Sequence, residues 1–166
     1  MSAPKKQRTT PTYELLYHPG IPGRGEYIRL ALEAAGVPYK DPANEGNKDV
    51  VYSTCSLENL YDGDGNPPPF APPALRVPSA GKDGKTLVIY QTPNILMYLG
   101  GEIGMAGEDE EVDRWFVNEL ALTALDASNE AHDTHHPVAA GQYYEGRRRP
   151  LPFSHMVNPR LRDWGL

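Results

Sequence analysis

The stretch that most restricts the fold runs from residue 70 to residue 99, where two short strands precede a helix. In residues 74–77, Ala-Leu-Arg-Val, the larger apolar side chains occupy every second position, which is typical of a half-buried strand. Residues 81–84, Gly-Lys-Asp-Gly, supply a turn, and residues 87–90, Leu-Val-Ile-Tyr, favour a second strand. The stretch therefore predicts a hairpin that leads directly into a helix.

The start of that helix predicts an anion site. Thr92 occupies the expected N-cap and Pro93 the first helical position, where the fixed φ of proline fits. Gly100-Gly101 offers a stop after apolar residues at helical spacing, which are Ile95, Leu96 and Leu99, with Ile103 beyond. Free backbone N–H groups at the helix N-terminus favour a bound anion. Taken alone, the pattern also fits a plain hairpin and capped helix, with Thr92 only closing the helix.

The N-terminal part of the chain predicts a βαβ unit. Residues 13–17, Tyr-Glu-Leu-Leu-Tyr, favour a strand, and the Pro- and Gly-rich residues 18–23 favour a loop. A helix is expected at about residues 24–35, ended by Gly36, before a second strand at residues 37–39. A crossover between parallel strands of this kind is right-handed almost without exception.

The rest of the chain predicts a link and a long helix. Residues 41–69 are irregular, with a short helix or turn within residues 49–60. The acidic residues 108–111 favour the first turn of a helix that runs to about Ala131. Because apolar side chains occur on nearly every side of that helix, we expect it to be packed on more than one face.

The order of these elements predicts an α/β fold, with a thioredoxin-like N-terminal domain followed by a partial all-α domain. The expected boundaries are a disordered segment at 1–11, the thioredoxin-like domain at 12–104, the partial helical domain at 108–145 and an unstructured tail at 146–166.

The net charge of −6 argues against a nucleic-acid partner. Residues 147–166 hold five Arg and one Asp, so the preceding residues, 11 basic and 21 acidic, carry −10. We interpret the arginine run at 147–149 as part of a solvated tail and not as a targeting or nucleic-acid patch. No apolar run approaches the ~20 residues of a membrane span. One cysteine, Cys55, excludes an internal disulfide and suits a reducing compartment, so we expect a cytoplasmic location.

Neither a metal site nor a redox site is expected. His132, His135 and His136 have ligand-like spacing, but no cysteine or carboxylate cluster accompanies them, and one short segment rarely closes a site. Cys55 lies in the irregular link and belongs to no Cys-x-x-Cys motif, so disulfide exchange is not expected.

Three signatures resemble cytosolic glutathione transferases, especially the fungal-type members with a tyrosine in the active site. They cover residues 12 to about 145 and match in order and spacing. The first comprises the strand, loop and helix of residues 13–36. The second comprises Pro72-Pro73-Ala74-Leu75 and the pair Gln91-Thr92, and the third is the histidine-containing segment 129–137.

The resemblance implies roles for individual residues. Tyr17 matches the tyrosine that donates a hydrogen bond to the glutathione sulfur, where it would stabilise the reactive thiolate of a thiol with a pKa of ~8.5. Arg24 matches an arginine near the sulfur, although a structural ion pair is an equal alternative. Pro73 matches a cis-proline. Gln91 and Thr92 match the pair that holds the γ-glutamyl end, at the helix N-terminus where the pattern predicts an anion site.

Two features depart from the family pattern. Pro72 stands where the family usually has a residue with an N–H, so one backbone hydrogen bond to glutathione cannot form. Residues 146–166 resemble nothing in the family, so we expect most of the family's helical domain to be missing and apolar groups on the long helix to be exposed.

The resemblance implies an enzyme that conjugates glutathione to a hydrophobic electrophile in detoxification. Glutathione would be the co-substrate, no metal would be needed, and a homodimer is the implied assembly. Two alternatives stay open at this point. One is a non-catalytic binding module with the same fold, and the other is an inactive truncated product without a stable fold.

Overall fold

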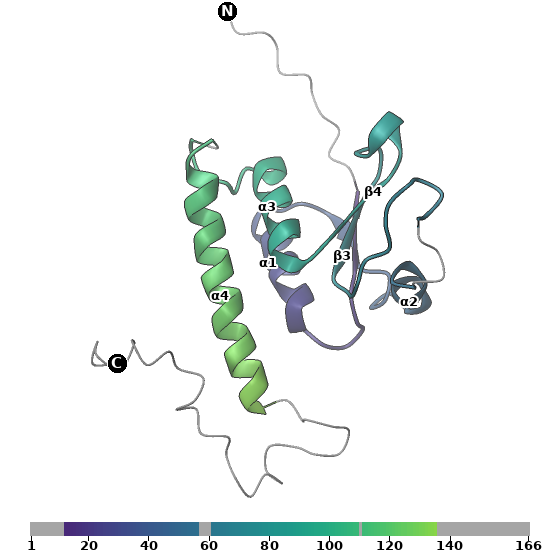
Figure 1. Ribbon diagram of the computed structural model, residues 1–166, viewed down its shortest axis with the longest axis horizontal. Helices are drawn as coiled ribbons and strands as arrows, with labels where there is room; N and C mark the ends of the chain where they lie inside the picture. Colours follow the sequence, from purple (N-terminus) through teal and green to yellow (C-terminus); the bar gives the residue numbers. More distant parts are fainter. Residues whose placement is uncertain (1–11, 57–60, 110, 136–166) are drawn as a thin grey trace, which may run out of the picture. The chain divides into compact units, whose positions relative to one another are not determined.

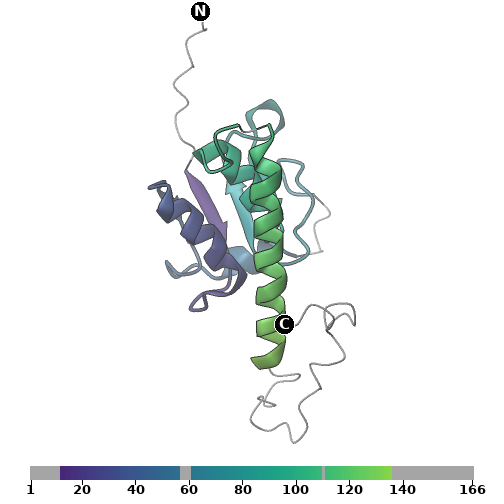
Figure 2. The same ribbon diagram turned by 90° about the vertical axis from the view of Figure 1, so that its left-hand side faces the viewer.

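The computed structural model describes residues 12–56, 61–109 and 111–135 (Figures 1 and 2). These residues fall into two units, the first ending at Leu122 and the second beginning at Thr123. The predicted boundaries of the domains are not tested by this division and stay predictions. The segments expected to be disordered or unstructured, 1–11 and 146–166, lie outside the described residues.

The first unit is built on a four-stranded mixed sheet in the order β2-β1-β3-β4. The strands are β1 (Tyr13–Leu16), β2 (Tyr39–Lys40), β3 (Ala74–Val77) and β4 (Leu87–Tyr90). β1 pairs with β2 in parallel and with β3 antiparallel, and β3 pairs with β4 antiparallel. The central strand β1 is the purple strand of Figure 2. Both the βαβ unit and the hairpin predicted from the sequence are confirmed. The fold of this unit is thioredoxin-like.

Helices cover both faces of the sheet. α1 (Glu26–Ala34) and α3 (Thr92–Ile103) lie on one face, and the short α2 (Asp49–Thr54) lies on the other (Figure 1). The larger core cluster packs against α1 and α3; it comprises Tyr13, Leu15, Tyr17, Ile28, Leu32, Leu75, Val77, Ile89, Ile95 and Leu99. A smaller cluster packs on the α2 side and comprises Leu16, Ala43, Val51, Ala74 and Val88. The predicted strand at residues 74–77 is confirmed, with Leu75 and Val77 buried and Arg76 partly exposed. It is more than half buried, because Ala74 packs in the cluster on the α2 side.

The first helical turn of the βαβ unit differs from the prediction. A 3₁₀ turn at Gly23–Gly25 precedes α1, which begins at Glu26. The backbone N–H of Glu26 donates to the carbonyl oxygen of Pro22 at 3.0 Å and joins the turn to the helix. This tighter turn brings the backbone of Gly23 and Gly25 close to the side chain of Tyr17, the residue that follows β1.

The ends of α3 also correct the prediction. Gln91 is the N-cap and Thr92 is already the first helical residue, without a side-chain capping hydrogen bond. The helix continues through Gly100 and Gly101 and ends at Gly104, which adopts the left-handed conformation with φ of 75°. Each glycine inside a helix costs about 1 kcal/mol relative to alanine. Packing of Leu99 in the core, together with the left-handed cap at Gly104, outweighs that cost.

The long helix α4 comprises Asp113–His135, so it begins and ends later than predicted. All of the acidic residues expected in its first turn, 108–111, precede it, and Asp113 is the acidic residue of the observed first turn. The Asp113 carboxylate accepts the Asp109 backbone N–H at 3.0 Å. The expected burial on several faces is wrong for the part of α4 in the first unit. Its exposed apolar side chains are Trp115, Phe116, Val117, Leu120 and Leu122. No helix among the described residues is long and apolar enough to cross a membrane.

Candidate functional site

The sheet register brings together segments that are far apart in the chain. Leu16 of β1 pairs with Ala74 of β3, and Ala74 pairs with Tyr90 of β4. The next residue after β1 is Tyr17, the residue before β3 is Pro73, and the residue after β4 is Gln91. These three predicted site residues therefore meet at one edge of the sheet, where α3 also begins.

Tyr17 is buried under the 3₁₀ turn that follows the loop after β1. Its side chain is 7% exposed. A Cβ atom at Gly23 would overlap the Tyr17 hydroxyl oxygen, and one at Gly25 would lie 2.6 Å from the ring. Only glycine at these two positions lets the backbone approach the ring this closely. The Gly-Arg-Gly sequence thus defines a slot for the tyrosine side chain.

The hydroxyl group of Tyr17 accepts one hydrogen bond within this slot. The backbone N–H of Arg24 donates to the Tyr17 oxygen at 2.9 Å. A phenol carries one proton to donate as well as oxygen lone pairs that accept. Among the described residues the structure has no acceptor for that proton. The group is therefore able to donate to an anion or a sulfur atom placed at this edge of the sheet.

Arg24 contributes to the site through its backbone. Besides its N–H bond to Tyr17, its carbonyl oxygen accepts a hydrogen bond from the Thr92 hydroxyl at 3.4 Å. Its side chain is exposed. A single residue of the turn therefore links the end of β1 to the start of α3. Neither the positive potential nor the ion pair considered from the sequence is tested by these contacts.

Thr92 and Gln91 form the start of α3. The Thr92 side chain is 2% exposed, and its hydroxyl faces the Arg24 carbonyl instead of capping the helix. Gln91 has φ of 70° and ψ of 119°, a conformation that costs a non-glycine residue about 1–3 kcal/mol. Its carbonyl oxygen accepts the Ile95 N–H at 2.9 Å. The side chain of Gln91 is exposed, so it is accessible to a ligand.

Pro72 and Pro73 complete the edge. The peptide bond between them is cis, in the position that the resemblance implies for Pro73. Pro73 is buried and Pro72 is partly exposed. Pro72 has no amide hydrogen, so its carbonyl oxygen is the one backbone hydrogen-bonding group that it offers.

Two side chains that contact the Tyr17 ring, those of His18 and Arg29, were not predicted from the sequence. The His18 ring lies 5.2 Å from the Tyr17 ring in an edge-on arrangement and 6.1 Å from the ring of Tyr52 on α2. The Arg29 guanidinium carbon lies 5.9 Å from the centre of the Tyr17 ring. His18 adjoins Tyr17 in sequence and could have been suspected. Arg29 follows Glu26 by three residues in α1, a spacing that by itself indicates only an ion pair along a helix.

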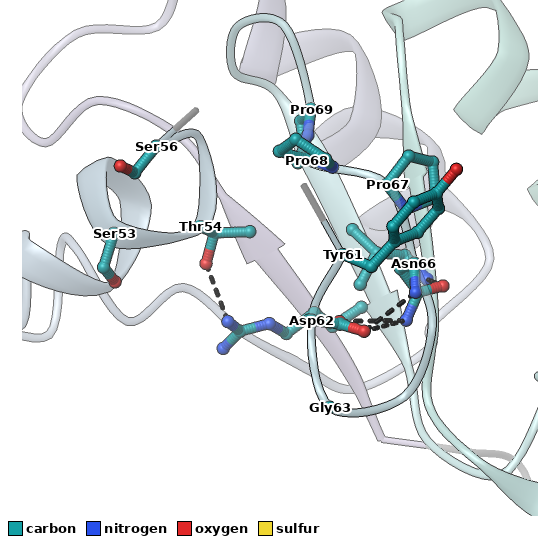
Figure 3. Close-up of a pocket in the computed structure, with 12 residues that line it drawn as sticks. Ser53, Thr54, Ser56, Tyr61, Asp62, Gly63, Asn66, Pro67, Pro68 and Pro69 are labelled. Atoms are coloured by element: carbon teal, nitrogen blue, oxygen red, sulfur yellow. Dashed lines mark hydrogen bonds between the residues drawn. The ribbon is translucent and has the colours of Figure 1, made fainter. Parts of the chain in front are cut away.

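A separate cavity lies on the α2 side of the sheet (Figure 3). It has a volume of about 360 Å³, and none of the predicted site residues lines it. The Thr54 hydroxyl, at one side of the cavity, accepts a hydrogen bond from Arg76 of β3 at 2.7 Å. At the other side, burial alone would raise the pKa of Asp62. Hydrogen bonds from Asn66 and from the backbone of the Asp62–Asn66 turn outweigh burial and hold that pKa below its usual value.

The metal and redox expectations can be compared with the described residues. Across 12–56, 61–109 and 111–135, no group of three or more His, Cys, Asp or Glu side chains could hold a metal ion. His136 lies outside these ranges. Cys55 follows α2, is partly buried, and burial raises the pKa of its thiol, which disfavours the reactive thiolate.

Comparison with known proteins gives structural likenesses alone. No protein-family model matches the chain, and no curated protein matches it. Among solved structures, a glutathione S-transferase from Ascaris lumbricoides is 28% identical over 63% of this chain and 42% of its own, with a TM-score of 0.41. A glutathione S-transferase from Caenorhabditis elegans is 28% identical over 74% of this chain and 50% of its own, with a TM-score of 0.49.

A third similar structure is prostaglandin synthase D of Nilaparvata lugens, 28% identical over 75% of this chain and 50% of its own, with a TM-score of 0.42. The chain thus spans half or less of the length of these three proteins. Because the TM-scores of these three structures lie below 0.5, the fold is assigned from the strand order and pairing described above.

Proposed function

We propose that this chain binds glutathione at the edge formed by Tyr17, Pro72-Pro73 and Gln91-Thr92, and that Tyr17 activates the thiol for transfer to an electrophile. The observation that supports this most directly is the Tyr17 hydroxyl. It is held by the Arg24 N–H, and among the described residues its own proton has no acceptor. The proposal combines this geometry with the resemblance of the motifs to glutathione transferases.

The proposed activation of the glutathione thiol depends mainly on the hydroxyl proton of Tyr17. A thiol with a pKa of ~8.5 is mostly protonated at neutral pH, and its thiolate is the nucleophile. A hydrogen bond from Tyr17 to the sulfur would favour the thiolate, and each unit by which the thiol pKa falls corresponds to ~1.4 kcal/mol. The thiol proton passes to solvent, the sulfur forms a bond to the electrophilic carbon, and the leaving group departs with the electron pair of its bond.

The start of α3 would bind the γ-glutamyl carboxylate. The first turn offers the backbone N–H groups of Thr92 and Asn94, since Pro93 has none and the Ile95 N–H donates to the Gln91 carbonyl. An anion at this position is favoured by about 0.3–1 kcal/mol. The Thr92 hydroxyl could donate to the carboxylate only by leaving the Arg24 carbonyl, a contact that is already long at 3.4 Å. The exposed Gln91 amide could donate without such a change.

Pro72 would weaken binding of the cysteinyl part of glutathione, because it offers one backbone hydrogen bond instead of two. Its carbonyl oxygen could accept the cysteinyl N–H, but the missing amide hydrogen leaves the cysteinyl carbonyl without its usual partner. Loss of one such hydrogen bond corresponds to about 0.5–1.5 kcal/mol. We therefore expect glutathione to bind more weakly than it would with an N–H at this position.

An apolar electrophile is the second substrate that we propose, with detoxification in the cytoplasm as the process and a homodimer as the assembly. The alternative is a module that binds glutathione without catalysis.

The test combines binding and turnover. Thermal denaturation of the chain with and without millimolar glutathione measures binding, because a ligand of the native state raises stability by RT ln(1 + [L]/Kd). Conjugation of glutathione to a chlorodinitrobenzene measures turnover, with Tyr17→Phe as the variant. Tyr61→Phe is the matched control, since it removes the same oxygen from a side chain that is 67% exposed and that lines the cavity on the α2 side, where none of the predicted site residues lies.

We expect glutathione to raise the denaturation temperature of the wild type and Tyr17→Phe to lower kcat about 10- to 100-fold, with Tyr61→Phe unchanged. Equal turnover by wild type and Tyr17→Phe would refute the role of Tyr17. Stabilisation by glutathione without turnover would establish the binding module instead. A denaturation temperature indifferent to glutathione would refute the site.

A further inference from the structure

The segment between β1 and α1 contains Arg24, whose backbone N–H donates to the Tyr17 oxygen. The contacts that hold this loop in place therefore determine the direction of the Tyr17 hydroxyl group. Residues 18–23 contain two prolines and two glycines, and both Gly20 and Gly23 have positive φ, at 74° and 44°. A glycine in such a loop has many accessible conformations when nothing holds it. The observed conformation therefore needs contacts from outside the loop.

Those contacts come from the segment after β2 and from α1. The Gly20 N–H donates to the Asn44 side-chain oxygen at 2.9 Å, and the Asn44 amide donates to the Asp41 carboxylate at 2.8 Å. Arg29 donates through Nε to the same Asp41 oxygen at 2.8 Å. These three side chains form one continuous hydrogen-bonded network.

Arg29 extends the network to the other end of the loop and to the tyrosine itself. Its Nη1 atom donates to the Pro22 carbonyl at 3.4 Å and to the Glu26 carboxylate at 3.0 Å. Its guanidinium carbon lies 5.9 Å from the centre of the Tyr17 ring, within the range of a cation–π contact. The loop is thus held at Gly20 by Asn44 and at Pro22 by Arg29.

The Arg29 guanidinium and the Asp41 carboxylate are shielded from solvent, so water competes little for the hydrogen bond between them. Each side chain is 12% exposed. Burial opposes the charge of Arg29, but its hydrogen bonds to Asp41 and Glu26 outweigh burial and hold its pKa above the usual value. Arg29 is therefore a cation at every pH at which glutathione chemistry could be measured. A planar fork of donors holds two acceptors in fixed directions, which lysine cannot do.

We propose that Asn44, Asp41 and Arg29 are positioning residues that hold the loop so that the Arg24 N–H stays on the Tyr17 oxygen. With that acceptor position occupied, the Tyr17 proton points out of the slot toward the place proposed for the substrate sulfur. The catalytic consequence rests on the proposed function, whereas the positioning of the loop does not.

The first test measures the loop directly by hydrogen exchange of the Arg24 backbone amide. The variant is Asn44→Ala, because Asn44 is exposed and its loss removes the contact with Gly20 without opening the core. Asn47→Ala is the matched control: it is the same change three residues away, at an exposed side chain that does not belong to the network of Asn44, Asp41 and Arg29. The amide of Leu75, in the central part of the sheet, reports global unfolding.

In Asn44→Ala we expect exchange of the Arg24 amide to become roughly three- to tenfold faster, as for loss of one or two hydrogen bonds. Exchange at Leu75 and exchange in Asn47→Ala should stay at the wild-type rate. Unchanged exchange at Arg24 would refute the positioning network. Equal acceleration at Arg24 and Leu75 would also refute it, since the change would then be global.

The second test separates positioning from binding in turnover. If Tyr17 acts as proposed, Asn44→Ala should lower kcat several-fold with little change in the KM for glutathione, because Asn44 is not at the proposed ligand site. Arg29→Gln should lower kcat further and Arg29→Lys should restore only part of it. A rise in KM with unchanged kcat would overturn the positioning role. If the wild type does not conjugate, the proposed function fails while the exchange measurement still decides the network.

Discussion

Replacing Gly25 with alanine would test how closely the 3₁₀ turn approaches Tyr17. The backbone of Gly25 has φ of −70° and ψ of −26°, which alanine adopts without strain, so the added methyl group is the main perturbation. That carbon would lie 2.6 Å from the Tyr17 ring, where real Cβ atoms essentially never lie. Overpacking of this kind costs about 1–3 kcal/mol, offset by about 0.4–1 kcal/mol from a less flexible unfolded chain.

We therefore expect Gly25→Ala to lower the free energy of unfolding by about 1–2 kcal/mol, measured by urea denaturation with the m value unchanged. Glutathione binding should weaken as well, because Tyr17 must move to admit the methyl group. Gly101→Ala is the matched control, since no atom lies within 4 Å of its added methyl group in α3. This control should raise stability by about 0.5–1 kcal/mol. Equal effects of the two substitutions would refute the close approach.

Three further predictions concern β3 and the Asp62–Asn66 turn that precedes it. Asn66→Ala removes the side chain that accepts the Val88 N–H at 3.0 Å and donates to the Thr86 carbonyl at 2.9 Å, so urea denaturation should give a loss of about 2–4 kcal/mol. Leu75→Ala creates a cavity where both sheet faces are covered, and the same measurement should give a loss of about 2–5 kcal/mol. The lowered pKa of Asp62 predicts that its contribution to stability is present above about pH 4 and lost as the pH falls through the folded-state pKa. Denaturation of Asp62→Asn should show a weaker decline over that acid range, and a decline equal to that of the wild type would contradict the hydrogen-bonded turn.

Much of the fold could be predicted because it depends on local patterns. The alternation in β3 and the Gly-containing turn before β4 are confirmed as a hairpin, and the strand–loop–helix start of the chain is confirmed as a βαβ unit. The helix ends could not be predicted as well. Gly100-Gly101 has the composition of a stop, but α3 passes through it because packing of Leu99 and the cap at Gly104 favour a longer helix.

The candidate site divides in the same way. Tyr17, Pro73, Gln91 and Thr92 could be selected from motif and order, and the sheet register brings them to one edge. Their partners could not be selected. Thr92 has the sequence of an N-cap, yet its hydroxyl faces the Arg24 carbonyl, a contact between residues 68 positions apart.

The sequence by itself determined the strands, the approximate positions of the helices, their order and the residues that we propose for glutathione binding. It did so because helix and strand periodicity, turn residues and the loss of an N–H at Pro72 are properties of neighbouring residues. Only the tertiary structure decided that Ala74 of β3 is buried on the α2 side and that the Arg24 N–H donates to the Tyr17 oxygen. The same holds for the contacts of Asn44, Asp41 and Arg29 with the loop between β1 and α1. Each of these depends on which segments meet in space, and hydrogen bonds between such segments leave no periodic trace in the chain.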